Sequence, residues 1–207
     1  MQGLRARVGD PCEQRRRPRR ETVRLQQRRE PRRLDDVATD LTRLGALLGT
    51  QAAAQPAADA YRRDIAQLRA QYATHPAVDV FYQVWDQPLM TINGSQMISD
   101  VIALCGGRNV FAALQPLAPT VSTEAVLAAN PEAIVTSAPG ATQPDTRLPQ
   151  LDTWRAWPAL TAVARGNLFA IDGDLLSRPA PRIAQGAALL CKDLEIARGR
   201  RPEGGAR

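Results

Sequence analysis

The sequence predicts an α/β fold, with a three-layer α/β body and a mainly parallel sheet preceded by a long helix. Short runs rich in β-branched and aromatic residues alternate with segments whose apolar residues recur every three or four positions. Such alternation is typical of a parallel sheet that is covered by helices. The chain has 207 residues, of which 44% are hydrophobic. That is enough for one sizeable α/β domain and excludes a globally disordered chain.

The N-terminal residues differ from the rest in charge. Residues 1–33 contain 12 Arg and four acidic residues, a net charge of +8, whereas the remainder carries −2. Residues 1–30 have few apolar side chains to bury, so we expect a disordered Arg-rich segment. Such a segment is typical either of a tail that binds the phosphates of a nucleic acid or of a solvated basic tail. It has no interleaved aromatic residue on which bases could stack. We therefore expect no nucleic-acid partner.

Residues 34–74 have helical periodicity. Apolar residues fall on one face in two sets, Leu34, Val37, Leu41, Leu44, Leu48 and Tyr61, Ile65, Leu68, Tyr72. Gly49 is a candidate helix stop, and Pro56 is suited to a helix start. The pattern fades by His75. We expect one long or interrupted helix here.

The remaining elements follow in alternation. Strands are expected over residues 78–84, 133–136 and 167–171, and helices over 97–105, from Ser122 onward, and over 183–197. Ser122 is a preferred helix cap, and the acidic residue after it suits a first helical turn. A short helical segment is expected around Trp154 and Trp157, and residues 172–174, Asp-Gly-Asp, are expected to form a turn.

Motifs of common enzyme classes are missing from the sequence. It contains no GxGxxG, GxxxxGK[ST], GxSxG or HExxH motif. The single histidine, His75, is expected to be a solvated loop residue, and it cannot by itself complete a His-based triad or a His-rich zinc site. We expect no catalytic residue, no metal site and no cofactor.

Two cysteines and one tryptophan have informative positions. Cys105 and Cys191 lie among apolar residues of two predicted helices, and their 86-residue separation is compatible with buried thiols or with a disulfide. Trp85 directly follows a predicted strand, at the point where a parallel sheet opens its ligand crevice. Tyr82 is a further aromatic candidate for the same crevice.

Five blocks occur in a fixed order: FYQVWDQPLMTI, SDVIALCGGRNVF, PTVSTEAVLAANPEAIV, GNLFAID and RPAPRIAQGAALLC. Together they resemble the C-terminal lobe of the vitamin B12 (cobalamin)-binding periplasmic proteins, and EPRRLDDVATDLTRLGALLGT resembles the segment leading into their linking helix. The resemblance covers about residues 30–198. It implies the substrate-binding component of an ABC importer of the helical-backbone class. Cobalamin or a related corrinoid would be cargo delivered to the membrane permease, and another subunit would hydrolyse ATP.

The resemblance also implies a domain organisation. After the disordered segment 1–30, it divides the chain into a linking or backbone helix region (31–76), a C-terminal α/β ligand-binding lobe (77–198) and a disordered tail (199–207). This is a truncated two-lobe solute-binding fold. No counterpart of the N-terminal lobe is evident, so we expect residues 1–30 to be the product of a truncation or frameshift, and ligand binding by one lobe to be weak.

Localisation is predicted in two conflicting ways. The resemblance implies the periplasm or the cell surface. The first residues contain no apolar core of a secretory signal. The literal chain would therefore remain in the cytoplasm, where cysteines stay reduced.

The same resemblance implies site residues. The corrin cleft would be bordered by Trp85, Tyr82, Ala118, Pro119 and Arg178. Aromatic walls and a few amide partners suit a large, mostly apolar disc with an amide rim. Glu124 would project from the tip of the lobe and dock onto arginines of the permease. Cys105 and Cys191 would form a disulfide.

Alternative functions remain open on the sequence. One is a receptor for another metal chelate, such as haem or a ferric siderophore. A nucleic-acid-associated protein acting through its basic tail is another, and a nonfunctional fragment is the last. Titration with cyanocobalamin, haem and siderophores would distinguish a cobalamin receptor from a receptor for another metal chelate. The sequence does not predict the oligomeric state.

Overall fold

The computed structural model describes residues 31–141 and 148–202, so the expected disordered segment 1–30 lies outside the described residues. The helices are α1 (Leu34–Leu48), α2 (Gln51–Tyr72), α3 (Met97–Leu104), α4 (Thr123–Ala129), α5 (Pro149–Asp152), the 3-10 helix η1 (Thr153–Ala156), α6 (Thr161–Ala164), α7 (Gly173–Leu176) and α8 (Ile183–Gly199). The strands are β1 (Val78–Gln83), β2 (Trp85–Asp86), β3 (Leu89–Met90), β4 (Gly107–Asn109), β5 (Ala133–Ala138) and β6 (Leu168–Asp172).

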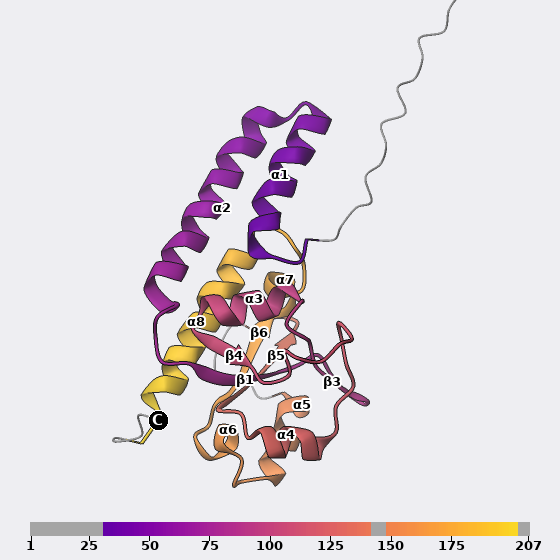
Figure 1. Cartoon of the computed structure of the whole chain (residues 1–207), viewed down its shortest axis with the longest axis vertical. Coiled ribbons are helices and arrows are strands. Elements are labelled where there is room, and N and C mark those ends of the chain that lie inside the picture. The colour runs from indigo at the N-terminus through magenta and orange to yellow at the C-terminus, as the bar shows by residue number, and fades with distance from the viewer. Residues whose placement is uncertain (1–30, 142–147, 203–207) are drawn as a thin grey trace, which may run out of the picture. The chain divides into compact units, whose positions relative to one another are not determined.

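The predicted long helix is interrupted and forms a helical hairpin. Gly49 ends α1 in the left-handed conformation, with φ of 71°, which favours glycine. The chain then turns back, and α1 and α2 lie side by side (Figure 1). They approach closely at Gly45, where a Cβ atom would lie only 2.3 Å from the Cβ of Ala54. Helix α2 begins ahead of Pro56, so that start prediction was wrong, because the Ala-rich residues before it favour helix.

The central sheet has the strand order β4-β1-β5-β6, and all its pairs are parallel. Three of its strands match the predicted runs. The short edge strand β4 was missed, because Gly-Arg-Asn carries no alternating apolar pattern. Asp172 was expected in a turn and instead caps α7, since its Oδ1 accepts a hydrogen bond from the N–H of Asp174 at 3.0 Å.

Helices cover both faces of this sheet (Figure 1). Val80, Val135 and Phe169 belong to a core shared with α2, α3 and α8. Their neighbours Phe81 and Ile134 point to the other face and pack with residues of α4, η1 and α6. Alternate burial on two faces follows from the two-residue period of a strand. The predicted three-layer α/β fold with a parallel sheet is confirmed.

The C-terminal end of α8 is ordered further than predicted. Gly199 is its last helical residue, although the disordered tail was expected to begin there. Arg200 Nη1 donates to the carbonyl of Gly166, and Arg201 Nη2 lies 2.6 Å from a carboxylate oxygen of Glu132. These bonds tie the first residues of the expected tail to the lobe, and residues 203–207 lie outside the described part of the chain.

Large exposed apolar side chains form two groups. They are Leu44, Leu47 and Leu48 at the end of the helical hairpin, and Val84, Trp85, Leu114 and Leu117 near the end of β1. Among the described residues, no helix combines the length and the apolar content that crossing a bilayer requires. The second group, named the apolar rim below, surrounds the edge of the sheet where the candidate site lies.

Candidate ligand site at the carboxyl edge of the sheet

The candidate site lies where the direction of strand addition reverses. From β1 the chain adds β4 on one side, and it then crosses to add β5 on the other side of β1. In open parallel sheets, ligands bind in the crevice outside the carboxyl ends of the strands at such a switch point. Here the chain leaves β1 at Gln83 and β5 at Ala138. The segments that follow these two residues are therefore the candidate walls.

The segment after β1 is a small hairpin that presents Trp85. Strands β2 and β3 pair antiparallel, with Trp85 opposite Met90, and the N–H of Val84 donates to the Met90 carbonyl at 2.9 Å. The indole Nε1 of Trp85 donates to the carbonyl of Gln87 at 3.0 Å, and the side chain is 59% exposed. The hairpin was not predicted from the sequence, but it places Trp85 at the edge where the strand pattern put it.

A third segment extends the hairpin into a ribbon. Thr120 forms a bridge with Met90, and the N–H of Thr91 donates to the carbonyl of Pro119 at 3.0 Å. Trp85 and Thr120 therefore flank Met90 on opposite sides. Ala118 is exposed beside this ribbon. The structure thus places Trp85 and the segment that carries Ala118 on opposite sides of β3 in one ribbon.

Tyr82 and Pro119 occupy positions that differ from the predicted ones. Tyr82 is only 2% exposed, and its hydroxyl is hydrogen-bonded to Ser137 Oγ. Burial raises the pKa of Tyr82 to about 12 although the bond to Ser137 acts in the opposite direction. Pro119 is also buried. Both residues therefore support the surface from beneath, because the strand period turns Tyr82 toward the core and the ribbon covers Pro119.

Arg178 follows β6 at the same edge of the sheet. Its side chain is exposed, and Nη2 lies 3.5 Å from Asp174 Oδ1, one helical turn earlier. An exposed pair of this kind contributes little to stability, so the guanidinium remains accessible to a ligand. The predicted position at the carboxyl edge is compatible with this geometry.

Glu124 lies on the first turn of α4. Ser122 caps the helix by accepting a hydrogen bond from the N–H of Ala125 at 3.2 Å. Glu124 is fully exposed, and hydrogen bonds from its own backbone and from Ser122 lower the pKa of its carboxyl. The side chain is thus an ionised, accessible carboxylate and not a core residue.

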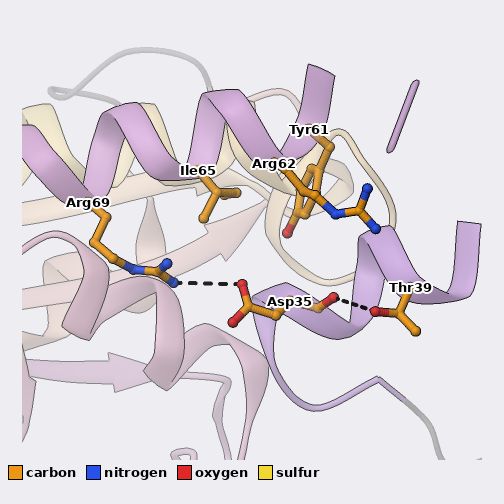
Figure 2. A pocket seen from close by; sticks show the side chains of 6 residues that line it. All are labelled: Asp35, Thr39, Tyr61, Arg62, Ile65 and Arg69. Carbon is orange, nitrogen blue, oxygen red and sulfur yellow. Dashed lines mark hydrogen bonds and ion pairs between the residues drawn. The ribbon is translucent and has the colours of Figure 1, made fainter. Parts of the chain in front are cut away.

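A separate hollow of about 320 Å³ lies between the hairpin helices (Figure 2). It is lined by Asp35, Thr39, Tyr61, Arg62, Ile65 and Arg69. Arg69 Nη2 is 3.9 Å from Asp35 Oδ1, and Tyr61 donates to the carbonyl of Leu34 at 2.9 Å. Burial raises the pKa of Tyr61 well above its usual value. None of the predicted site residues lines this hollow, and its arginines are already paired, Arg69 with Asp35 and Arg62 with Asp59.

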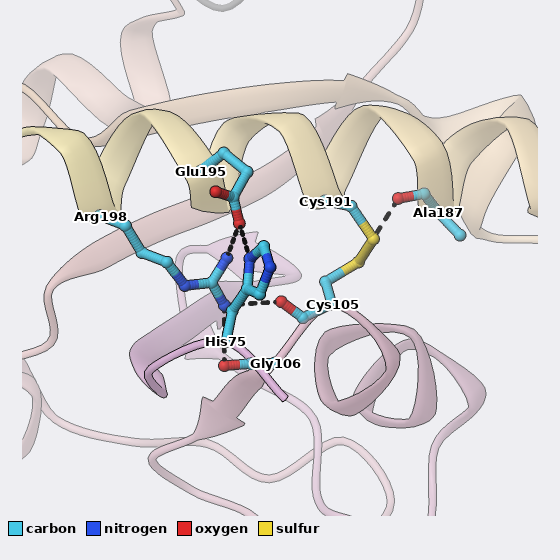
Figure 3. The surroundings of a disulfide bond; sticks show 7 residues. All are labelled: His75, Cys105, Gly106, Ala187, Cys191, Glu195 and Arg198. Carbon is cyan, nitrogen blue, oxygen red and sulfur yellow. Dashed lines mark hydrogen bonds and ion pairs between the residues drawn. A yellow bond between two sulfur atoms is a disulfide. The ribbon is translucent and has the colours of Figure 1, made fainter. Parts of the chain in front are cut away.

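Cys105 and Cys191 are joined by a disulfide, with an S–S distance of 2.06 Å (Figure 3). The pairing that the resemblance implied is therefore present in the structure. Beside it, Arg198 donates to the carbonyls of Cys105 and Gly106 at 2.7 and 3.0 Å. His75 was expected to be a solvated loop residue; its Nδ1 instead lies 2.7 Å from Glu195 Oε1.

No group of three or more His, Cys, Asp or Glu side chains that could hold a metal ion occurs within residues 31–141 and 148–202. The edge described above offers exposed apolar side chains and the guanidinium of Arg178. Such an arrangement can bind a large apolar ligand with a polar rim.

A family model described as "Periplasmic binding protein" matches residues 5–175, most of the chain. The chain belongs to the periplasmic binding protein family. The match begins before the described residues and overlaps the Arg-rich segment. Members of this family bind solutes and are not enzymes, so the prediction that the chain is not an enzyme is confirmed.

Curated members of the periplasmic binding protein family show where this chain is similar. It is 34% identical over 165 residues to the vitamin B12-binding protein of Vibrio cholerae, covering 79% of this chain and 57% of that relative. Identity to the vitamin B12-binding protein of Yersinia pestis is 33% over 167 residues, covering 80% of this chain and 55% of the relative. The chain thus spans little more than half the length of these relatives. In both names vitamin B12 is a ligand and not a cofactor.

Solved structures of the family agree with the fold. The periplasmic vitamin B12-binding protein BtuF of Vibrio cholerae matches with a TM-score of 0.72 and 32% identity, covering 82% of this chain and 64% of that one. The periplasmic heme-binding protein RhuT of Roseiflexus sp. RS-1 matches with a TM-score of 0.68 at 21% identity. The second match supports the fold alone.

The sequence reasoning missed several residues that shape this edge. Leu114 and Leu117 lie in a loop whose exposure no periodic pattern indicates. Gln83 was counted within a strand, and its buried amide was not considered. The alternation of strand residues could have indicated that Gln83 points to the same face of the sheet as Phe81. Its hydrogen-bond partner Trp154 lies too far along the chain to be recognised from the sequence.

Proposed function

We propose that this chain is the substrate-binding component of an ABC importer and that its ligand is cobalamin or a related corrinoid. The observation that carries the proposal is the 34% identity to a vitamin B12-binding protein over 165 residues, 79% of this chain. The exposed hairpin at the switch point gives this similarity a physical basis, because it supplies an aromatic surface for the ligand.

The apolar rim fits the shape and polarity of a corrin. A corrin is a wide disc with apolar faces and amide groups around its rim, so exposed apolar side chains can cover one face. Trp85 and Leu117 would contact the disc, and Ala118 would allow close approach. Arg178 carries only hydrogen-bond donors, which suit the carbonyl oxygens of the amide rim. Tyr82 and Pro119 are left out of direct contact in this proposal because they are buried.

Glu124 is proposed as the docking contact for the membrane permease. Its carboxylate is exposed and stays ionised, and it lies on α4 (Figure 1), a helix that carries no residue of the apolar rim. A charge-assisted hydrogen bond to an arginine of the partner would give both orientation and specificity. Ligand binding and permease docking would therefore use different residues.

The proposed location is the periplasm or the cell surface. The family name indicates such a location, and a disulfide between Cys105 and Cys191 persists in an oxidising compartment. Mass spectrometry of the protein isolated from its natural host, with and without prior reduction, would test this. Free thiols at both positions would contradict the proposed location.

The ligand is tested by isothermal titration of the purified chain with cyanocobalamin, hemin and a ferric hydroxamate siderophore. We expect cyanocobalamin to bind most tightly. Trp85→Ala should weaken this binding by about tenfold or more, because a central aromatic contact dominates such a surface. Leu47→Ala, which removes an equally exposed apolar side chain from the hairpin, is the matched control and should leave affinity unchanged. Tighter binding of hemin, or equal affinities for wild type and Trp85→Ala, would overturn the proposal.

Docking is tested with the cognate permease complex reconstituted in proteoliposomes. Glu124→Ala should weaken co-sedimentation with the vesicles by about tenfold, while the affinity for cyanocobalamin stays the same. Asp64→Ala, on the exposed face of α2, removes a comparable charge and should have no effect. Unchanged co-sedimentation of Glu124→Ala would exclude this residue as the docking contact.

A further inference from the structure

We infer that Gln83 is a positioning residue of the proposed ligand site: its buried amide fixes residues 148–157 to the end of β1 and so sets one wall of the cleft. The effect on ligand affinity rests on the proposed function, whereas the effect on the wall does not. In the proposed site Gln83 does not contact the ligand. It acts through the segments that it holds.

The side chain of Gln83 bonds to two groups of the opposite wall. Its Oε1 accepts a hydrogen bond from the indole Nε1 of Trp154 at 2.6 Å. Its Nε2 donates to the carbonyl of Gln150 at 3.3 Å. Gln83 is only 1% exposed, and Trp154 is buried as well. The bond to Trp154 is therefore sheltered from water, which strengthens it and makes its loss costly, whereas the bond to Gln150 is partly buried.

The backbone of Gln83 connects a third segment. Its carbonyl accepts a hydrogen bond from Thr136 Oγ1 at 2.9 Å, and Thr136 is buried in β5. In the parallel register Gln83 lies opposite Thr136. One residue thus joins the end of β1, the end of β5 and the segment that follows β5. These are the elements that form the switch point.

Aromatic packing extends this connection toward the apolar rim. The ring of Trp154 lies edge-on to Phe81, with centroids 5.6 Å apart and an angle of 77°. Phe81 in turn lies edge-on to Phe111 at 5.7 Å. Phe111 begins the loop that carries Leu114 and Leu117. The wall held by Gln83 and the loop of the apolar rim therefore share one packed aromatic cluster.

The requirement for glutamine follows from its chemistry. A single amide supplies one acceptor for the indole N–H and one donor for the carbonyl of Gln150. Leucine has a similar size but would leave both buried groups without partners. Glutamate would keep the acceptor for Trp154 and lose the donor for Gln150. The two substitutions thus separate the two bonds.

The consequence concerns the preformed shape of the cleft. The hairpin that presents Trp85 begins one residue after Gln83, and residues 148–157 follow β5 on the other side of the switch point. If the second wall loosens, a ligand must order it on binding, and that ordering opposes affinity. Gln83 therefore contributes to affinity without contacting the ligand.

The experiment compares Gln83→Leu, Gln83→Glu and a matched control, Phe169→Leu, in the full chain. Phe169 is buried on the opposite face of the sheet, so its truncation lowers global stability without touching the wall. Hydrogen exchange without ligand is measured for peptides of residues 148–157 and of α2, together with the Kd for cyanocobalamin. We expect Gln83→Leu to raise exchange of 148–157 relative to α2 by roughly tenfold. Gln83→Glu, which loses the donor and buries a carboxyl group, should also raise it, and Phe169→Leu should not.

Affinity should follow the same order. Gln83→Leu is expected to weaken cyanocobalamin binding by several-fold to tenfold, and Phe169→Leu to leave it near the wild-type value. Exchange in 148–157 that rises equally in Gln83→Leu and Phe169→Leu would overturn the inference, as would equal affinity losses in the two variants. If the wild type binds no cobalamin, the proposed function fails, and the exchange comparison still decides whether Gln83 positions the wall.

Discussion

The two edges of the parallel sheet are held together by different chemistry. At the amino edge, where the strands begin, arginines form ion pairs and bond to backbone carbonyls. At the carboxyl edge, the supporting bonds join neutral groups, such as Gln83 with Trp154 and Tyr82 with Ser137. Exposed apolar side chains surround the second edge.

The amino edge is closed by two charged clusters. The side chain of Arg198 is 8% exposed and donates to the carbonyls of Cys105 and Gly106 (Figure 3). It also donates to the carbonyl of Pro76. The carboxylate of Glu132 forms ion pairs with Arg201 Nη2 at 2.6 Å and with Arg165 Nη1 at 2.8 Å. Burial alone would raise the pKa of the Glu132 carboxyl, but the two arginines hold it below its usual value.

The contrast indicates a division of labour within one lobe. The charged groups of the two amino-edge clusters are already paired with one another or with backbone carbonyls. They therefore stabilise the lobe and are not available to bind a ligand. The carboxyl edge satisfies its buried polar groups with neutral bonds and leaves apolar surface exposed. A site for a large apolar ligand is therefore expected at the carboxyl edge. The predictions below test the structural role of the charged edge.

Removal of the disulfide should have the largest effect. Cys105 and Cys191 close a loop with a sequence separation of 86 residues at the amino edge. Because a cross-link restricts the unfolded chain, Cys105→Ala with Cys191→Ala should lower the free energy of unfolding by about 2–4 kcal/mol. Urea denaturation measures this value. A dithiothreitol-treated wild type should match the double variant, and an unchanged midpoint for both would show that the cross-link adds no stability.

Loss of a buried arginine should be the next largest effect. Arg198→Ala leaves the carbonyls of Pro76 and Cys105 without this donor, whereas Gly106 keeps the N–H of Val78 and Glu195 keeps His75. The variant should destabilise the lobe by about 3 kcal/mol in thermal or urea unfolding. The control is Arg108→Ala, since Arg108 pairs with Asp79 at the same edge but is largely exposed. Its loss should cost less than about 1 kcal/mol. Similar losses for both variants would contradict a role for burial.

A buried carboxyl on α8 should give a smaller, pH-dependent effect. Burial raises the pKa of Asp193 to about 7. The folded state then binds a proton that the unfolded state releases at lower pH, so this residue lowers stability progressively from about pH 4 to pH 7. Asp193→Asn should therefore increase the free energy of unfolding by on the order of 1–2 kcal/mol at pH 8, and by much less at pH 4. Unfolding curves of both proteins at the two pH values provide the measurement, and an equal gain at both would exclude titration of Asp193 as the cause.

Local patterns in the sequence were sufficient for most of the lobe. The strands predicted at 78–84, 133–136 and 167–171 and the helices α3, α4 and α8 are present with small shifts in their bounds, because each carries its own apolar pattern. The short elements β2, β3, β4 and α6 were missed. They contain two to four residues and depend on neighbours that are distant in the chain.

The candidate site was predictable only in part. Trp85 was identified because a residue directly after a strand in a parallel sheet lies at the ligand edge. The burial of Tyr82 and Pro119 was not foreseen, since Tyr82 points into the core and Pro119 belongs to a ribbon formed by segments that are distant in the chain. The cysteine pairing came from the resemblance and not from the residues themselves, which left free thiols equally possible.

The sequence by itself determined the α/β class, the order of the main strands and helices, and the edge of the sheet at which Trp85 lies. Local periodicity encodes which face of each element is apolar, and that information needs no distant partner. Only the tertiary structure decided which polar groups meet. Gln83 and Trp154 are 71 residues apart, and Arg198 and Cys105 are 93 apart. Packing of the whole lobe brings such pairs together, because a hydrogen bond forms only when both groups are held within about 3 Å of each other.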